Sequence, residues 1–276
     1  MSWEQLRQLE DPNQRDILIA TPNTGQVSYR WATSLRMLQI PPYFSWATAG
    51  AQGQPIDLAR NVLVTNALRD KSKYIFFLDS DVIPKEDTLI KLVKLNLPIV
   101  SGVYFSRANP AFIVANRNYV PLSWNELAQA GQPLVEVDEV GTGCLLIDIR
   151  VIERMMEMKK YQFFCIVNHN PQGQPKRKMI FDHKTARANN YLCPECMSKG
   201  AANILVAEFF DFHLLKEGDH FESEDYYFCR IARELGFRVF IDLNTTVIHE
   251  SAPMHISEQG VVNPVISIND LGGRMT

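Results

Sequence analysis

The sequence has few cysteines and no long apolar run. Its five cysteines are an odd number and only Cys193 and Cys196 lie close together, which is not the pattern of a disulfide-stapled secreted scaffold. No stretch approaches the roughly 18 apolar residues of a membrane span. Residues 1–16 also lack the apolar core of a signal peptide. We therefore expect a cytoplasmic protein with reduced thiols and no transmembrane segment.

The chain also lacks the strong positive charge of a nucleic-acid-binding protein. Its formal net charge is −3, so we expect no nucleic acid partner. Hydrophobic residues make up 46% of the 276 residues, which is enough for one substantial core. We expect a single domain over residues 1–252 that carries an insertion at residues 161–220, followed by a C-terminal tail at residues 253–276.

Short apolar runs alternate with segments of helical periodicity in the first half of the chain. This alternation is typical of strand–helix–strand units, which form a mostly parallel sheet with helices on its faces. The fold class that we expect is therefore α/β, with an inserted subdomain. The expected strands are residues 16–21, 43–48, 73–78, 98–104, 140–147, 237–242 and 245–249, and the expected helices are residues 26–38, 56–69, 86–95, 150–159 and 223–235. Residues 111–139 are expected to be irregular, with short antiparallel pieces.

The expected strand at residues 73–78 is apolar enough to be buried on both faces, and two carboxylates, Asp79 and Asp81, follow it. Ligands of open α/β sheets bind beyond the carboxyl ends of the strands. Carboxylates at such a place can bind Mg²⁺ or Mn²⁺, and the cation can neutralise a diphosphate. Alternatively, Asp79 caps the turn and Asp81 caps the following helix. The Asp-x-Asp pattern alone does not decide between metal binding and capping.

A second acidic pair, Glu224 and Asp225, opens the expected helix at residues 223–235, for which Ser223 is a natural N-cap. The two carboxylates precede Phe228 by four and three positions, which places them at the inward edge of the first helical turn. A carboxylate there could accept a proton as a general base. The alternative is that the pair only interacts favourably with the helix dipole.

Other polar residues follow strands of the same sheet or lie on its helices. Thr21 and Pro22 lie at the end of the first expected strand, where they could touch a nucleotide. His249 ends the last expected strand and could ligate the same cation as the carboxylates, or be a structural histidine. Arg60 lies in the helix at residues 56–69, where it either offers a cationic fork to a diphosphate or is solvated.

Taken together, these elements resemble the GT-A glycosyltransferases, specifically the family-2-like enzymes. The matching stretches are Thr21-Pro22, Ala59-Arg60-Asn61, Phe77-Leu78-Asp79-Ser80-Asp81, Val140-Gly141-Thr142-Gly143-Cys144-Leu145, Ser223-Glu224-Asp225-Tyr226-Tyr227-Phe228-Cys229 and Thr246-Val247-Ile248-His249. Their order and separations extend over residues 16–250, although the insertion has no counterpart in the resemblance. The combination is far more specific than any one of its members.

The resemblance implies a Rossmann-like GT-A fold and a hexosyltransferase type of activity. The donor would be a nucleotide sugar, a UDP- or GDP-sugar, and the acceptor a carbohydrate or another hydroxyl compound. A divalent cation, Mn²⁺ or Mg²⁺, would hold the donor diphosphate. By similarity, Asp81 and His249 would be metal ligands, and Asp79 would contact the ribose or reach the metal through water.

The resemblance also assigns the remaining residues. Thr21, Pro22 and Arg60 would line the nucleotide pocket. Gly141-Thr142-Gly143 would let the backbone approach the donor sugar or the acceptor, because glycine permits a close approach.

In inverting members, one residue of the Glu-Asp pair is the base. We expect Asp225 in that role, with Glu224 as a ligand of the acceptor hydroxyl or as the alternate base. Retaining GT-A enzymes share the Asp-x-Asp and histidine features, so both stereochemical outcomes stay open. The metal and Arg60 would stabilise the leaving nucleoside diphosphate.

The insertion carries a second possible metal site. Cys193 and Cys196 have the two-residue spacing of a zinc knuckle. The other half of a structural Zn²⁺ site could come from Cys165 with His169 or His183. The alternatives are two buried thiols, or a disulfide that forms only on oxidation.

Two other functions remain open. A sugar-phosphate nucleotidyltransferase also uses an α/β nucleotide fold and a metal. Against it, there is no glycine-rich, basic phosphate loop near the first strand, where Gly25 is the only glycine before Gly50. A non-catalytic carbohydrate-binding protein would require the acidic residues to be only capping groups.

Overall fold

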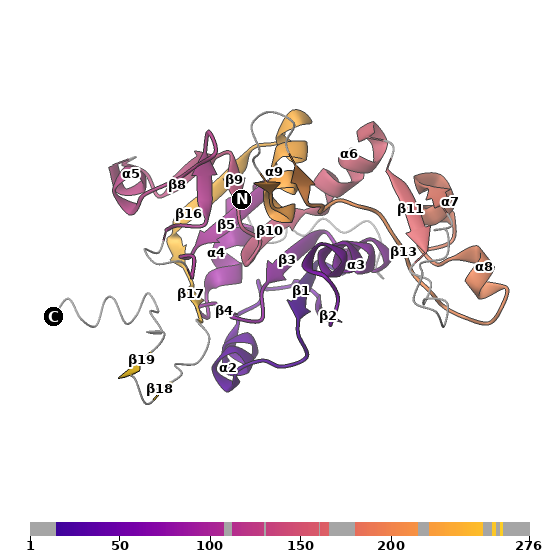
Figure 1. Cartoon of the computed structure of the whole chain (residues 1–276), viewed down its shortest axis with the longest axis horizontal. Coiled ribbons are helices and arrows are strands. Elements are labelled where there is room, and N and C mark those ends of the chain that lie inside the picture. The colour runs from indigo at the N-terminus through magenta and orange to yellow at the C-terminus, as the bar shows by residue number, and fades with distance from the viewer. Residues whose placement is uncertain are drawn as a thin grey trace.

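A seven-stranded sheet forms the centre of the computed structural model, which describes residues 15–107, 112–129, 131–159, 161–165, 180–214, 221–250, 256–257 and 260–261 (Figure 1). The strand order is β2-β1-β3-β10-β5-β16-β8. In that order the strands are Trp46–Gln52, Ile17–Asn23, Tyr74–Leu78, Cys144–Asp148, Ile99–Val103, Val239–Thr246 and Leu134–Val137.

The strands β2, β1, β3, β5 and β16 all run in the same direction. β1 is parallel to both β2 and β3, and β16 is parallel to β5. β10 lies antiparallel between β3 and β5, and β8 lies antiparallel to β16 at the edge. The predicted fold class, α/β with a mixed and mostly parallel sheet flanked by helices, is therefore confirmed.

Helices cover both faces of this sheet. Their bounds are Tyr29–Met37 for α2, Ile56–Arg69 for α3, Thr88–Leu95 for α4, Ile149–Lys159 for α6 and Glu224–Glu234 for α9. One core contains side chains of α3, α6 and α9 with Leu18 and Ile75 of the sheet, and the other contains side chains of α2 and α4 with Ile17 and Tyr74. Successive strand residues thus enter opposite cores, as the two-residue period of a strand requires.

The described part of the insertion forms a small sheet of its own, in the order β12-β11-β13 (Figure 1). Its elements are β11 (Gln162–Cys165), β12 (Ile180–Asp182), α7 (His183–Ala188), α8 (Pro194–Met197) and β13 (Leu205–Val206). The Asp182 side chain caps α7 by accepting a hydrogen bond from the Thr185 backbone N–H, at 2.7 Å.

Short strands and one helix complete the described structure. They are β4 (Val82–Ile83) with β17 (Ile248–His249), β6 (Ala115–Arg117) with β7 (Val120–Pro121) and β9 (Glu139–Val140), β14 (His213–Leu214) with β15 (Phe221–Glu222), β18 (Ile256–Ser257) with β19 (Gly260–Val261), and α5 (Trp124–Gln129). The antiparallel pair β6 and β7 lies in the stretch that we expected to be irregular with short antiparallel pieces. The helix α5 in the same stretch was not predicted.

Several predicted boundaries were wrong, and three of them have a clear physical reason. β2 begins three residues later than predicted, because the chain turns at Pro41 and Tyr43 takes a left-handed φ of 68°. α4 begins at Thr88 and not at residue 86, because residues 85–88 form a turn in which the Thr88 N–H donates to the Lys85 carbonyl oxygen at 3.1 Å. The expected strand at residues 140–147 is broken at Gly141-Thr142-Gly143, because β9 pairs with β6 while β10 joins the central sheet.

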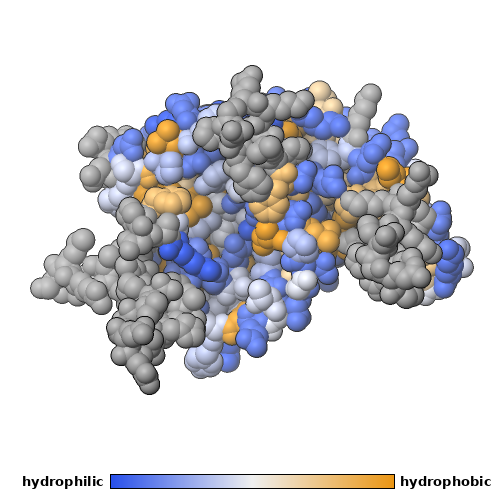
Figure 2. Space-filling model, in the orientation of Figure 1, coloured by the Kyte–Doolittle hydropathy of each residue, from blue (hydrophilic) through white to orange (hydrophobic). Residues whose placement is uncertain are grey.

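No helix among the described residues is long and apolar enough to cross a membrane. On the face shown in Figure 2, hydrophilic and hydrophobic residues are interspersed over the described surface.

Candidate active site

The turn that follows β3 is held by three hydrogen bonds to the backbone of Asp79. The Asp79 N–H donates to the carbonyl oxygen of Gly143, at 3.1 Å. The Asp79 carbonyl oxygen accepts from the Val82 N–H at 3.0 Å and from the indole N–H of Trp31 at 2.8 Å. Trp31, in α2, is buried and was not identified from the sequence. These contacts fix the position from which the Asp79 and Asp81 side chains extend.

Antiparallel pairing between β4 and β17 brings His249 beside this turn. His249 pairs with Val82, and the Glu250 N–H donates to the Asp81 carbonyl oxygen at 2.6 Å. Residues that are far apart in the sequence thus become neighbours at the carboxyl end of β3. Because β4 and not a helix follows Asp81, the alternative that Asp81 is a helix cap is wrong.

The imidazole of His249 is oriented by the loop that follows β5. Its Nδ1 lies 2.8 Å from the carbonyl oxygen of Phe105, which can only accept, so Nδ1 carries the proton. Nε2 is then the unprotonated nitrogen, and it lies 3.7 Å from Oδ1 of Asp81. Burial is the main cause that lowers the pKa of His249 below its ordinary value. A neutral imidazole whose Nδ1–H bonds a backbone carbonyl is the usual state of a histidine metal ligand.

The guanidinium of Arg107 lies between these two groups. It forms an ion pair with the Asp81 carboxylate, and its Nε–H donates to Nε2 of His249 at 3.1 Å. A carboxylate oxygen and a neutral imidazole nitrogen therefore already converge on one positive charge. This donor set fits a divalent cation such as Mn²⁺ or Mg²⁺.

Arg60 is the centre of a buried ionic cluster. Its side chain is 4% exposed, and its Nη1 lies 2.9 Å from Asp79 Oδ1 while its Nε lies 3.1 Å from Glu224 Oε1. Burial alone would lower the pKa of Arg60, but the charges of Asp79 and Glu224 outweigh burial and raise it. The alternative that Arg60 is a solvated helix residue is therefore wrong. Its guanidinium joins the acidic turn after β3 to the start of α9.

The two carboxylates at the start of α9 have different surroundings. Glu224 is buried and faces Arg60, whereas Asp225 is partly exposed. Burial, followed by the negative charge of Glu224, raises the pKa of Asp225 to about 6. Ser223 precedes the helix as predicted, but its hydroxyl donates to Oδ1 of Asp225 and does not cap the backbone. The other oxygen, Oδ2, faces Gly141.

The glycines of Gly141-Thr142-Gly143 make room for the ring of Tyr104. A side chain at Gly141 would overlap the Tyr104 hydroxyl oxygen, and one at Gly143 would come within 2.9 Å of the ring. The Gly143 N–H donates to the Tyr104 hydroxyl oxygen at 2.9 Å. The same ring lies edge-on to His249, with 5.6 Å between the ring centroids. Here the close approach that glycine permits is made by a side chain of the protein itself.

Thr21 and Pro22 lie in β1 itself and not in a loop beyond it, because β1 extends to Asn23 beside β2. Both residues are buried. Ala20 pairs with Phe77, so Thr21 and Pro22 lie level with the end of β3 and the start of the acidic turn. A role in nucleotide binding stays a prediction.

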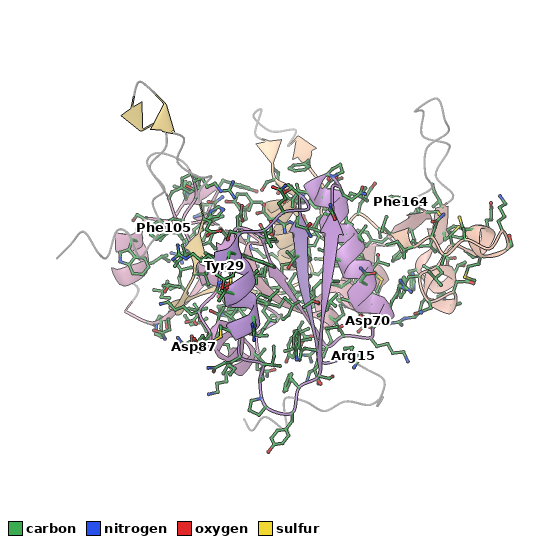
Figure 3. The ribbon with its side chains drawn as sticks, turned by 90° about the horizontal axis from the view of Figure 1, so that it is seen from below. Arg15, Tyr29, Asp70, Asp87, Phe105 and Phe164 are labelled. Atoms are coloured by element: carbon green, nitrogen blue, oxygen red, sulfur yellow. The ribbon has the colours of Figure 1, made fainter. Side chains whose placement is uncertain are left out.

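The predicted cysteines of the insertion also come together, away from this site. Cys165, Cys193 and Cys196 form one buried group, whereas His183 begins α7 and is not part of it. His169 lies outside the described residues. In Figure 3, Phe105 beside the acidic turn and Phe164 in β11 lie on opposite sides of the central sheet.

Tyr104, Phe105 and Arg107 were missed by the sequence analysis. They follow β5, whose carboxyl end lies at the same edge of the sheet as that of β3. The strand-end rule that identified Asp79 could also have identified them. No comparable signal marks Trp31, because its role depends on the packing of α2.

The fold and the site define an α/β domain with an acidic, histidine-containing edge. In comparisons with known proteins, residues 49–183, just under half of the chain, match the model of the Anp1 family. The matched stretch contains Arg60, Asp79 and Asp81 but not the start of α9 or His249. No curated protein matches the chain.

Among solved structures, the chain is similar to the crystal structure of A197 from STIV, with a TM-score of 0.46 and 15% sequence identity. That similarity covers 91% of this chain and 95% of the other.

Proposed function

We propose that the chain is a metal-dependent glycosyltransferase that moves a sugar from a nucleotide-diphosphate sugar to a hydroxyl acceptor. The observation that carries this proposal is the pairing of β4 with β17, which places a neutral His249 beside Asp81. The Anp1 match over residues 49–183 supports the same class of activity. That family is mannosyltransferase-like, so a mannosyl donor is the first to test.

Asp81 and His249 would hold the cation, with Asp79 close by. When bound, the cation supplies positive charge that neutralises the donor diphosphate. The predicted contact of Arg60 with a diphosphate stays a prediction, and Asp79 and Glu224 engage its guanidinium in the structure. It positions those two carboxylates. Arg107, whose side chain is 47% exposed, is the arginine that could turn toward a diphosphate.

Asp225 is the proposed base of an inverting reaction. Its ionised carboxylate would accept the proton of the acceptor hydroxyl on Oδ2 while the hydroxyl oxygen bonds to the anomeric carbon of the donor sugar. The nucleoside diphosphate would leave with the electron pair of the broken bond. A base whose pKa is near 6 is ionised at neutral pH and remains basic enough to take a proton. Glu224, held by Arg60, is not free for this step.

Calorimetry with UDP and with GDP, each with and without Mn²⁺, tests the metal-dependent binding step. We expect binding of one nucleotide that requires the cation in the wild type and is lost in Asp81→Ala and His249→Ala. Matched controls are Asp87→Ala, an exposed aspartate paired with Lys91, and His183→Ala at the start of α7. Both controls should bind as the wild type does.

Product analysis tests the reaction. Incubation with UDP- and GDP-sugars, including a mannosyl donor, should release nucleoside diphosphate in the presence of Mn²⁺ or Mg²⁺. If Asp81→Ala, His249→Ala and Asp225→Asn all left donor hydrolysis and transfer intact, the proposal would fail. Release of pyrophosphate would instead indicate a nucleotidyltransferase, and nucleotide binding that ignores the cation would favour a non-catalytic carbohydrate-binding protein.

A further inference from the structure

Three cysteines of the insertion form a buried cluster that the proposed reaction does not use. Cys165 ends β11, Cys193 immediately precedes α8, and Cys196 lies within α8. Their sulfur atoms all lie within 4.8 Å of one another, and the side chains are at most 8% exposed. None of the three is in a disulfide. Cys165 lies far in the sequence from the other two, so its place in the cluster results from the fold.

The separation of the sulfur atoms matches ligands that share one ion. Zinc bound tetrahedrally at about 2.3 Å from each sulfur places two sulfurs about 3.8 Å apart, whereas a disulfide holds them at about 2.0 Å. The Sγ atoms of Cys165 and Cys196 are 3.6 Å apart. The observed distance is therefore close to that of two thiolates on one zinc ion.

One hydrogen bond of the cluster also fits a metal-bound sulfur. The side-chain N–H of Asn203 donates to Sγ of Cys196, at 3.2 Å. An N–H that points at a ligand sulfur is the outer-shell contact that metal sites use to orient their ligands. Cys229, buried in α9 outside the cluster, behaves differently, because its S–H donates to the Val140 carbonyl oxygen at 3.7 Å. Cys229 is thus hydrogen-bonded as a thiol. Cys196 accepts from Asn203, and in its contact with Cys165 either sulfur could be the donor.

We propose that Cys165, Cys193 and Cys196 bind a structural Zn²⁺ ion as thiolates. Each thiol would release its proton to solvent as the ion binds. Three thiolates leave one position of a tetrahedral ion, and His169, which the sequence suggests for it, lies outside the described residues. The proposal depends on the sulfur geometry and is independent of the proposed sugar transfer.

The bound ion would stabilise the position of β13, the last strand of the small sheet. The Cys193 N–H donates to the Asn203 carbonyl oxygen at 2.8 Å, and Cys165 pairs with Leu205 across β11 and β13. The Leu205 carbonyl oxygen in turn accepts from the Thr65 hydroxyl of α3, at 3.0 Å. The cysteine cluster and α3 therefore hold the same short segment from two sides.

That segment continues to residues that bond Asn61, the neighbour of Arg60 in α3. Asn61 in α3 accepts from the backbone N–H groups of Phe209 and Phe210 at 2.9 and 3.0 Å, and donates to the Phe210 carbonyl oxygen at 2.8 Å. The Phe210 ring stacks on Phe228 of α9, with 4.6 Å between centroids, and meets Phe77 of β3 edge-on at 5.4 Å. A zinc ion at the cysteines would thus stabilise a segment that packs beneath the start of α9.

Metal analysis of the purified full chain tests the site. We expect about one zinc per chain in the wild type and in the control Cys229→Ala, and less than about a tenth of that in Cys193→Ala and Cys196→Ala. Cobalt in place of zinc should give the intense near-ultraviolet charge-transfer absorption of a thiolate-bound ion, and the control should retain it.

A measurement on the wild type covers the case in which the cysteine variants do not fold. Removal of zinc by a chelator should lower the temperature of unfolding and expose three more thiols to a thiol reagent, and added Zn²⁺ but not Mg²⁺ should reverse both changes. A wild-type chain that contains no stoichiometric zinc and binds neither added Zn²⁺ nor Co²⁺ would overturn the proposal. So would a mass two units lower under non-reducing conditions, because it would show a disulfide.

Discussion

Replacing Arg60 by methionine removes the charge at the centre of the ionic cluster while retaining a long side chain. Removal of one partner of a buried ion pair typically costs about 3–5 kcal/mol, because it leaves a buried charge unpaired. The Glu224 side chain is 8% exposed and the Asp79 side chain is 25% exposed. Water can therefore solvate part of the charge of Asp79 when Arg60 is removed. We therefore expect the free energy of unfolding to fall by about 3 kcal/mol, at the lower end of that range.

Urea unfolding, followed by fluorescence, measures this change. The matched control is Arg238→Met, since Arg238 also donates two hydrogen bonds to one carboxylate, that of Glu136. Those two side chains are 63% and 51% exposed, and such surface pairs contribute about 0–1 kcal/mol. The difference between the two variants isolates the effect of burial.

A double-mutant cycle shows whether the loss comes from pairing with Glu224. Arg60→Met, Glu224→Gln and the double variant are compared, and the double variant should be less destabilised than the sum of the single variants by about 1 kcal/mol or more. Additive effects, or a loss for Arg60→Met no larger than that for Arg238→Met, would refute the ionic cluster as described.

Three further predictions concern groups at the edge of the site. The activity of the wild type should fall about tenfold per pH unit below about pH 6, because Asp225 must be ionised to accept a proton and its pKa is about 6. Ser223→Ala should move this fall to higher pH, since the lost hydrogen bond favours the ionised carboxylate; an unchanged profile would exclude Asp225 as the titrating base. Gly141→Ala should lower the free energy of unfolding by about 1–3 kcal/mol, because the new methyl group overlaps Tyr104. Gly53→Ala is the comparison, because Gly53 has a left-handed φ and open space around it, so this variant shows the effect of backbone strain without steric overlap. Arg107→Ala should strengthen Mn²⁺ binding measured by calorimetry while slowing transfer, because the guanidinium competes with the cation at Asp81; weaker Mn²⁺ binding would contradict this role.

The sequence was sufficient to predict the fold class and the helix α3, whose bounds the structure confirms. Hydrophobic residues indicate burial, and β3 is apolar and buried at every position, so that signal is clear there. Some of the boundaries that were wrong depend on partners that are distant in the sequence. β4 exists because β17 pairs with it, and nothing in residues 82–83 alone indicates such a pairing.

The residues proposed for the site could be identified by type and position, but not their partners. Arg60 was predicted to face a diphosphate, and the structure directs it to Asp79 and Glu224. The sequence shows that α3 carries an arginine. Which carboxylates pair with that arginine depends on how α9 and β3 are placed in three dimensions. The roles of Trp31 and Tyr104 are invisible for the same reason, because both arise from packing between separate elements.

The hydrogen bonds from Asn61 to the end of the insertion involve only main-chain atoms of Phe209 and Phe210. Nearly every amino acid offers these atoms, proline lacking the N–H. These hydrogen bonds therefore constrain the path of the backbone and by themselves place no restriction on the two side chains. The restriction comes from packing, because the buried Phe210 ring stacks on Phe228. A different segment could replace this one if it kept the backbone geometry of the two residues and a ring in the place of Phe210.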